Sequence, residues 1–178
     1  AFEHAGIKSI TIPNSVTAIG HGAFNDCQSL ESVVLPNRLS KLSSSMFNYC
    51  HQLKSIDIPQ SVTVIEDGAL YMCESLSEII VPDGVESVEG RAFAGCKNLE
   101  TITFGRSVNK IGYSALARCK KLQSIYIRAT VPPTLEPHLF KDPDDGVPDV
   151  TIYVPIDSVD EYKTSESWSR YADRIEGY

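Results

Sequence analysis

The five cysteines are the residues of this chain best suited to redox, nucleophilic or metal chemistry. They recur every 23 residues, at Cys27, Cys50, Cys73, Cys96 and Cys119. None of them forms a C-x-x-C pair, which argues against a structural zinc site. Such regular spacing indicates one position of a repeated unit, with all five side chains pointing the same way into the core. We therefore expect a ladder of buried thiols, which are small, apolar and unreactive.

Histidines and a short acidic stretch are the other candidates for chemistry. His51 follows Cys50 directly, but adjacent side chains on one turn point in different directions, so a Cys–His nucleophile is not expected. Asp142, Asp144 and Asp145 lack the alternating spacing and the distal glutamate of an EF-hand, and a solvated loop is the favoured interpretation. An incidental divalent cation site stays open there. We predict no catalytic residue, no cofactor and no dedicated metal site.

Charge and hydropathy narrow the possible classes of function. The chain has 178 residues, with 16 Lys or Arg against 23 Asp or Glu, and a net charge of -7. Residues 128–178 hold 5 basic and 11 acidic residues, which is -6 of that total. A nucleic-acid-binding protein would carry a basic surface, so nucleic acid is excluded as a partner. No apolar run approaches the roughly twenty residues that span a bilayer, so no membrane span is predicted.

A repeated unit of 23 residues explains the cysteine spacing. The unit reads L-x-x-I-x-I-P-x-x-V-x-x-I-x-x-x-A-F-x-x-C-x-x, and five full copies cover residues 7–121. A single unit cannot bury its apolar positions alone, so a period of this length indicates a solenoid with a continuous core. The chain begins within a repeat, so we expect the solenoid to continue in a longer protein or to meet a partner at that end.

Each part of the unit predicts a local structure. The I-x-I segment alternates and is rich in branched residues, so it is expected to form a strand parallel to that of the next unit. Proline ends this strand because it cannot donate to the sheet. The A-F-x-x-C segment is expected to form one short helical turn on the opposite side. The predicted class is an α/β solenoid, with one short parallel strand per 23-residue repeat, over residues 1–128.

The last part of the chain departs from the repeat. Residues 129–149 contain five prolines and are expected to form a loop. Residues 151–155, T-I-Y-V-P, restore the strand signature. Ser158 then opens a capping box before a short helix that includes Tyr162. We predict that residues 129–178 form an α/β cap on the solenoid, within the same structural domain.

The repeat resembles the BspA-like class of leucine-rich repeats, of the Treponema pallidum type. The copies at residues 53–75 and 99–121 match that pattern closely, whereas its glycine survives only at Gly20 and Gly112. The resemblance implies a right-handed leucine-rich-repeat solenoid in a non-enzymatic, secreted or cell-surface bacterial protein, similar to those of Bacteroides-type bacteria. It also implies adhesion or protein binding, with host extracellular matrix proteins such as fibronectin or fibrinogen as partners.

The outward positions of the strands are the best candidate for a ligand-binding face. Side chains alternate along a strand, so stacked strands place one outward residue of every repeat in a column. The column contains Thr11, Val34, Asp57, Ile80, Thr103 and Tyr126. A shallow face with little charge suits a protein ligand better than catalysis, which needs converging titratable groups. The alternative is a solvated sheet face, where hydroxyl residues simply favour strands.

Two other functions stay open at this point. The first is a structural spacer, a stiff arm within a larger surface protein, whose outward residues should be uniformly polar. A binding module should instead gather aromatic residues on one face. The second is an enzyme with its site where the repeats meet the cap, near Tyr126, His138 and Asp142, which would have to approach within hydrogen-bond distance.

Overall fold

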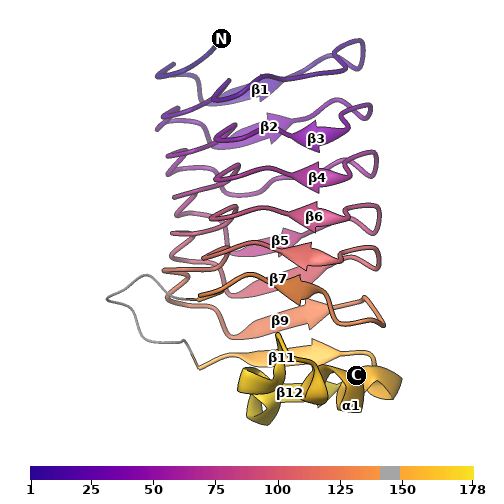
Figure 1. Ribbon diagram of the computed structural model, residues 1–178. Helices are drawn as coiled ribbons and strands as arrows, with labels where there is room; N and C mark the ends of the chain where they lie inside the picture. The colour runs from indigo at the N-terminus through magenta and orange to yellow at the C-terminus, as the bar shows by residue number, and fades with distance from the viewer. Residues whose placement is uncertain (141–148) are drawn as a thin grey trace.

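The chain winds into a solenoid whose turns stack from the N-terminus to the C-terminal cap (Figure 1). The structure is a computed structural model, and it describes residues 1–140 and 149–178. The core runs along the inside of the coil, where the repeated apolar positions of successive turns meet. The predicted leucine-rich-repeat solenoid is confirmed.

Parallel strands form one side of the coil, which we call the strand face. Strands β1 (Ser9–Thr11) and β2 (Ser32–Val34) make a two-stranded sheet. A second sheet follows along the coil, with strands in the order β12-β11-β9-β7-β5. Its repeat strands are β5 (Glu78–Ile80), β7 (Thr101–Phe104) and β9 (Ser124–Ile127). Equivalent residues of successive repeats pair directly, and the inward isoleucine of each strand is buried. The predicted strands, parallel and at a spacing of 23 residues, are therefore found at these repeats.

A further parallel sheet lies on the other side of the coil from the strand face, and its strands run in the opposite direction (Figure 1). It contains two-residue strands in the order β10-β8-β6-β4-β3. They are β3 (Lys41–Leu42), β4 (Val64–Ile65), β6 (Ser87–Val88), β8 (Lys110–Ile111) and β10 (Thr134–Leu135). The second strand of a repeat was not expected from the sequence, because two residues are too short to show an alternating pattern. This sheet continues through the repeats without a gap.

The A-F-x-x-C segments form turns, which we call the turn side, and the expected helical turn is wrong. The residue before each segment and the fourth residue of the segment have left-handed backbone, as Ser45 (φ 54) and Tyr49 (φ 60) do. Alternate amide groups therefore point toward the next repeat, and those between them bond within the turn, as Asn48 N–H does to the Ser45 carbonyl at 3.2 Å. Phe47 N–H donates to the Ala69 carbonyl at 2.8 Å, and Tyr49 N–H donates to the Tyr71 carbonyl at 2.9 Å. The segments bond to their neighbours, which satisfies backbone groups that a helix would have paired internally.

The cap extends the strand-face sheet beyond the last repeat. Strand β11 (Thr151–Val154) pairs with β9, as the sequence predicts, and β12 (Ile175–Gly177) adds a further strand that was not foreseen. Between these strands lie a 3₁₀ helix at Ile156–Ser158, the helix α1 (Val159–Thr164) and a second 3₁₀ helix at Ser169–Arg174.

Two buried aromatic side chains attach the cap to the preceding loop. Trp168 Nε1–H donates to the Pro133 carbonyl at 2.7 Å, and the Tyr162 hydroxyl donates to the Ala129 carbonyl at 2.8 Å. The predicted short helix with Tyr162 is confirmed. The predicted capping box is wrong, because Ser158 is itself buried and its side chain makes no capping hydrogen bond in the part of the cap that is described.

Among the helices of the described residues, none has the length and apolar character needed to cross a membrane.

Candidate functional site: the strand face

The structure brings most of the predicted ligand-binding residues into one column on the strand face. Thr11 pairs with Val34, Ile80 pairs with Thr103, and Thr103 pairs with Tyr126. Val34 is 57% exposed and Ile80 is 50% exposed, and both lie on strands that border the interruption of the sheet, β2 and β5. The geometry of the column is therefore as predicted for these five residues. That the column binds a ligand stays a prediction.

Two further tyrosines extend this column at the cap end, and sequence reasoning did not include them. Tyr153 of β11 pairs with Tyr126, and the two rings stack with centroids 4.7 Å apart. The Tyr178 ring meets Tyr126 edge-on at 5.8 Å. The strand signature of residues 151–155 was a signal for Tyr153, because it places that residue in the register of Tyr126. Nothing in the repeat pattern indicated Tyr178.

The sixth predicted residue, Asp57, lies where the strand-face sheet is interrupted. Residues 55–58 form no strand, and their backbone N–H and C=O groups make no hydrogen bond with the neighbouring repeats that the structure describes. Aspartate is disfavoured in strands, and Asp57 stands in the register between Val34 and Ile80, where it has no matching cross-strand partner. The inward residues still reach the core, since Ile56 and Ile58 are buried. The interruption is thus local to the face.

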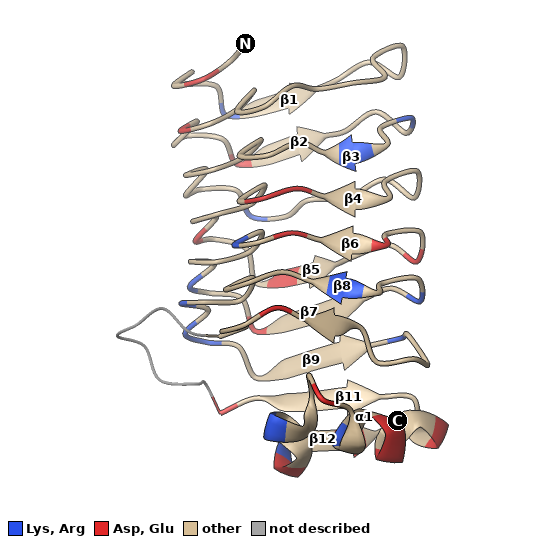
Figure 2. Ribbon diagram, viewed as in Figure 1, with Lys and Arg blue, Asp and Glu red and all other residues tan. Residues whose placement is uncertain are grey.

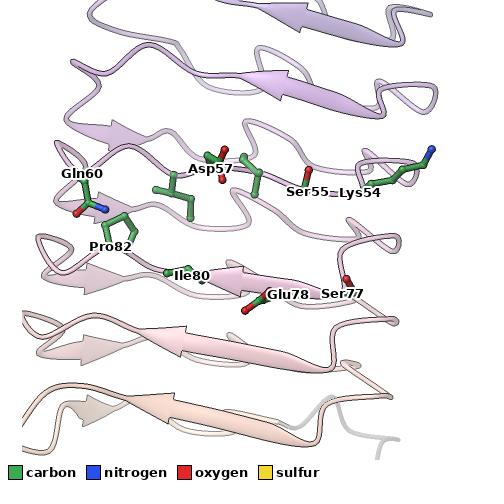
Figure 3. Close-up of a pocket in the computed structure, with 10 residues that line it drawn as sticks. Lys54, Ser55, Asp57, Gln60, Ser77, Glu78, Ile80 and Pro82 are labelled. Carbon is green, nitrogen blue, oxygen red and sulfur yellow. The ribbon is translucent and has the colours of Figure 1, made fainter.

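A hollow of about 430 Å³ opens at this interruption (Figure 3). Residues 54–58 and Gln60 line one wall. The opposite wall belongs to the next repeat and includes Ser77, Glu78, Ile80 and Pro82. The hollow therefore combines unpaired backbone, two carboxylates and an exposed apolar side chain.

The two carboxylates of the hollow differ from most others on the coil. Asp57 and Glu78 are exposed and have no hydrogen bond or ion pair within the described residues. At the edge of the hollow, by contrast, Lys54 Nζ lies 2.6 Å from the Glu31 carboxylate of the preceding repeat. Figure 2 shows basic and acidic residues interleaved along the coil. The strand face therefore carries unpaired negative charge at the hollow.

The cysteines form the predicted buried ladder and take no part in the strand face. All five are free and buried, and each thiol donates to a backbone carbonyl of the preceding repeat, as Cys50 Sγ does to Phe24 at 3.2 Å. Burial raises the pKa of the Cys50 thiol to about 12. These thiols are therefore inert at neutral pH.

His51 does not pair with Cys50, because its ring faces Glu74, with Nδ1 and Oε1 3.5 Å apart.

Of the enzyme site considered for the junction of repeats and cap, the structure describes Tyr126 and His138 and does not bring these two together. Tyr126 belongs to the strand face, whereas His138 borders a separate hollow of about 60 Å³ beside Arg170 and Tyr171. His138 makes no side-chain hydrogen bond in the described part of the chain, so it is not bonded to Tyr126. Asp142 lies outside the described residues, and so do the acidic neighbours Asp144 and Asp145. Among residues 1–140 and 149–178, no three His, Cys, Asp or Glu side chains are grouped as metal ligands.

Solved structures of bacterial leucine-rich-repeat proteins share this fold. The Treponema pallidum leucine rich repeat protein superposes with a TM-score of 0.73 at 20% identity, over 96% of this chain and 85% of that one. The pneumococcal vaccine antigen PcpA superposes with a TM-score of 0.71 at 20% identity, over 96% of this chain and 40% of that one. A leucine rich cell surface protein of Faecalibacterium prausnitzii superposes with a TM-score of 0.52 at 29% identity, over 73% of this chain and 41% of that one.

The repeat itself identifies the family. The pattern of the BspA type leucine rich repeat region matches residues 1–123, in six copies. No curated protein matches the chain. The match covers more than half of the sequence, and the coil, the 23-residue spacing and the buried consensus positions agree with it. The chain therefore belongs to the family of proteins with BspA-type leucine-rich repeats.

Proposed function

We propose that this chain binds a protein ligand through its strand face and acts in adhesion at a bacterial cell surface. Leucine-rich repeats of this family are protein-interaction scaffolds, and the Faecalibacterium prausnitzii neighbour is described as a cell surface protein. Host extracellular matrix proteins such as fibronectin and fibrinogen are the first partners to test, as the family resemblance suggests.

The observation that carries this proposal is the gathering of apolar and aromatic side chains in one outward column. Val34 and Ile80 are exposed, and Tyr126, Tyr153 and Tyr178 cluster at the cap end. Protein interfaces are enriched in aromatic residues at their centres. A spacer arm would have no reason to expose such residues on one face, so the column favours binding over a purely structural role.

A binding screen with a matched control tests the proposal. The chain is assayed by surface plasmon resonance against immobilised fibronectin, fibrinogen and other matrix proteins. We expect saturable binding to at least one of them, and loss of that binding when Val34, Ile80 and Tyr126 are changed together to Ser. The control changes Val131, Tyr49 and Tyr113 to Ser, which are apolar or aromatic side chains exposed outside the strand face.

The outcomes separate the candidate functions. Binding that survives the strand-face variant and falls with the control variant would move the site away from the strand face. No saturable binding to any matrix protein would contradict adhesion through such partners and would favour the spacer role.

A further inference from the structure

We propose that the hollow at the sheet interruption, between residues 55–58 and the repeat of β5, accepts an extended segment of the protein ligand and holds an arginine side chain of that segment. This inference rests on the proposed function, because it names the chemistry that the strand face recognises. It is carried by three features that occur together at this repeat: unpaired backbone, unpaired carboxylates and an exposed apolar wall.

The backbone at the hollow offers hydrogen bonds that the fold does not use. Strands β7 and β9 pair on both sides, so their N–H and C=O groups are satisfied within the sheet. Residues 55–58 lack these partners among the described repeats and line the hollow. Backbone groups that are left without partners in a sheet are the groups an extended peptide pairs with when it adds to the sheet.

The charge at the hollow selects a cationic side chain. Asp57 and Glu78 stand on opposite walls, and neither has a basic partner within the described residues. A guanidinium group presents five N–H donors in a fixed fork and binds a carboxylate through two parallel hydrogen bonds, which a single ammonium does less well. Arginine is therefore the side chain that best matches a hollow bordered by unpaired carboxylates.

The apolar part of the hollow suits the stem of the same side chain. Ile80 is half exposed and Pro82 lies beside it on the same wall. The methylene groups of an arginine pack well against such a surface while the guanidinium reaches the carboxylates. A volume of about 430 Å³ accommodates one large side chain together with a short length of backbone.

A labelled peptide provides the direct test. The probe is fluorescein-labelled acetyl-Thr-Val-Arg-Val-Thr-amide, titrated with the 178-residue chain and followed by fluorescence anisotropy. Replacing arginine by citrulline removes the charge at nearly constant shape, and methylating the valine amides removes backbone donors. We expect saturable binding of the probe and a loss of about tenfold or more with either modified peptide.

Two variants locate the binding site. Asp57→Asn combined with Glu78→Gln should lower the affinity for the probe about tenfold or more. Glu86 is an exposed glutamate just before β6, and Glu86→Gln should leave the affinity for the probe unchanged. In hydrogen exchange, the probe should protect the amides of residues 56–58 and leave those of β7 unchanged. Equal affinity for the arginine and citrulline peptides, an unaffected double variant, or no saturable binding of the probe up to millimolar chain would overturn the inference.

The same double variant separates this inference from the proposed function. If the double variant keeps full affinity for a matrix protein while the change of Val34, Ile80 and Tyr126 abolishes binding, the strand face binds but the hollow does not select arginine. If neither variant alters binding, the proposed function of the strand face fails as well. Loss in both variants supports the two together.

Discussion

The turn side and the strand face of the coil are built from the same repeat, yet only one of them is continuous. On the turn side, amides of each A-F-x-x-C segment donate to the next repeat, and the Phe24 and Phe47 rings stack at 5.3 Å. On the strand face the sheet stops at β2 and resumes at β5. The solenoid therefore does not need every strand to stay assembled, which leaves the strand face free to carry residues that suit a ligand.

Ion pairing also differs between the turn side and the strand face. Beside the turn side, acidic and basic residues pair between neighbouring repeats, as in Arg91–Asp67 at 3.0 Å and Lys97–Glu74 at 2.7 Å. On the strand face, Asp57 and Glu78 are left unpaired within the described residues. A surface whose polar groups already satisfy one another gains little by binding a partner, whereas unpaired groups gain more. This difference supports the proposal that a ligand is recognised at the interruption.

The largest expected effect contrasts a core ring with a strand-face side chain. Phe47→Ala removes a fully buried ring that stacks on Phe24, and we expect it to lower the free energy of unfolding by about 3–5 kcal/mol. Ile80→Ser alters a half-exposed position and should cost about 1 kcal/mol or less. Urea unfolding followed by circular dichroism measures both. Similar losses for the two variants would contradict the idea that the turn side holds the stack.

The second effect is a loss of stability at high pH that comes from the thiol ladder. Burial raises the pKa of Cys119 to about 12 and holds those of Cys73 and Cys96 well above the ordinary value. Thiols of the unfolded chain ionise near pH 8.5, so the unfolded state releases protons first. The contribution of the thiols to the free energy of unfolding should therefore be constant below that pH and should fall as the pH rises above it.

Replacing one thiol isolates its share of this pH dependence. Each buried thiol contributes a slope of about 1.4 kcal/mol per pH unit between the two pKa values. In Cys73→Ser the hydroxyl can still donate to the Phe47 carbonyl but does not titrate in this range. Urea midpoints at pH 8, 9 and 10 should fall less steeply for this variant than for the parent chain. Parallel curves would mean that Cys73 ionises as easily in the fold as in the unfolded chain.

The repeat pattern predicts those parts of the fold in which every repeat has the same local structure. The cysteine spacing indicated a buried ladder, and the I-x-I-P segments indicated parallel strands in register, because a repeated apolar position must meet its equivalent in the next turn. The turn side was mispredicted, because a helical turn and a left-handed turn place Ala, Phe and Cys on the same inward side. Only the backbone angles, such as φ 60 at Tyr49, distinguish the two.

The candidate site was predicted less completely, because it depends on departures from the repeat. The column from Thr11 to Tyr126 follows from alternation along the strands, but the gap at residues 55–58 does not. Asp57 was placed in the column as one outward residue among six. Its effect on pairing depends on neighbours one repeat away in either direction, Val34 and Ile80, and so on contacts that a single repeat does not contain.

The smallest expected effect is the difference in stability between substitutions of two aspartates, one on the turn side and one on the strand face. Asp67 lies on the turn side and holds Arg91 and the Tyr113 hydroxyl, the latter at 3.2 Å, whereas Asp57 has no such partners among the described residues. Asp67→Asn should lower the free energy of unfolding by about 1 kcal/mol or less, because Asp67 and Arg91 are both partly exposed and solvent screens their attraction. Asp57→Asn should leave it unchanged, since Asp57 has no hydrogen bond or ion pair to lose within the described residues. Urea unfolding at low and high salt measures both, and added salt should bring the two variants together as the charges are screened. If Asp57→Asn were the more damaging change, Asp57 would have a partner within the fold, and the unbalanced charge of the strand face would no longer be available to a ligand.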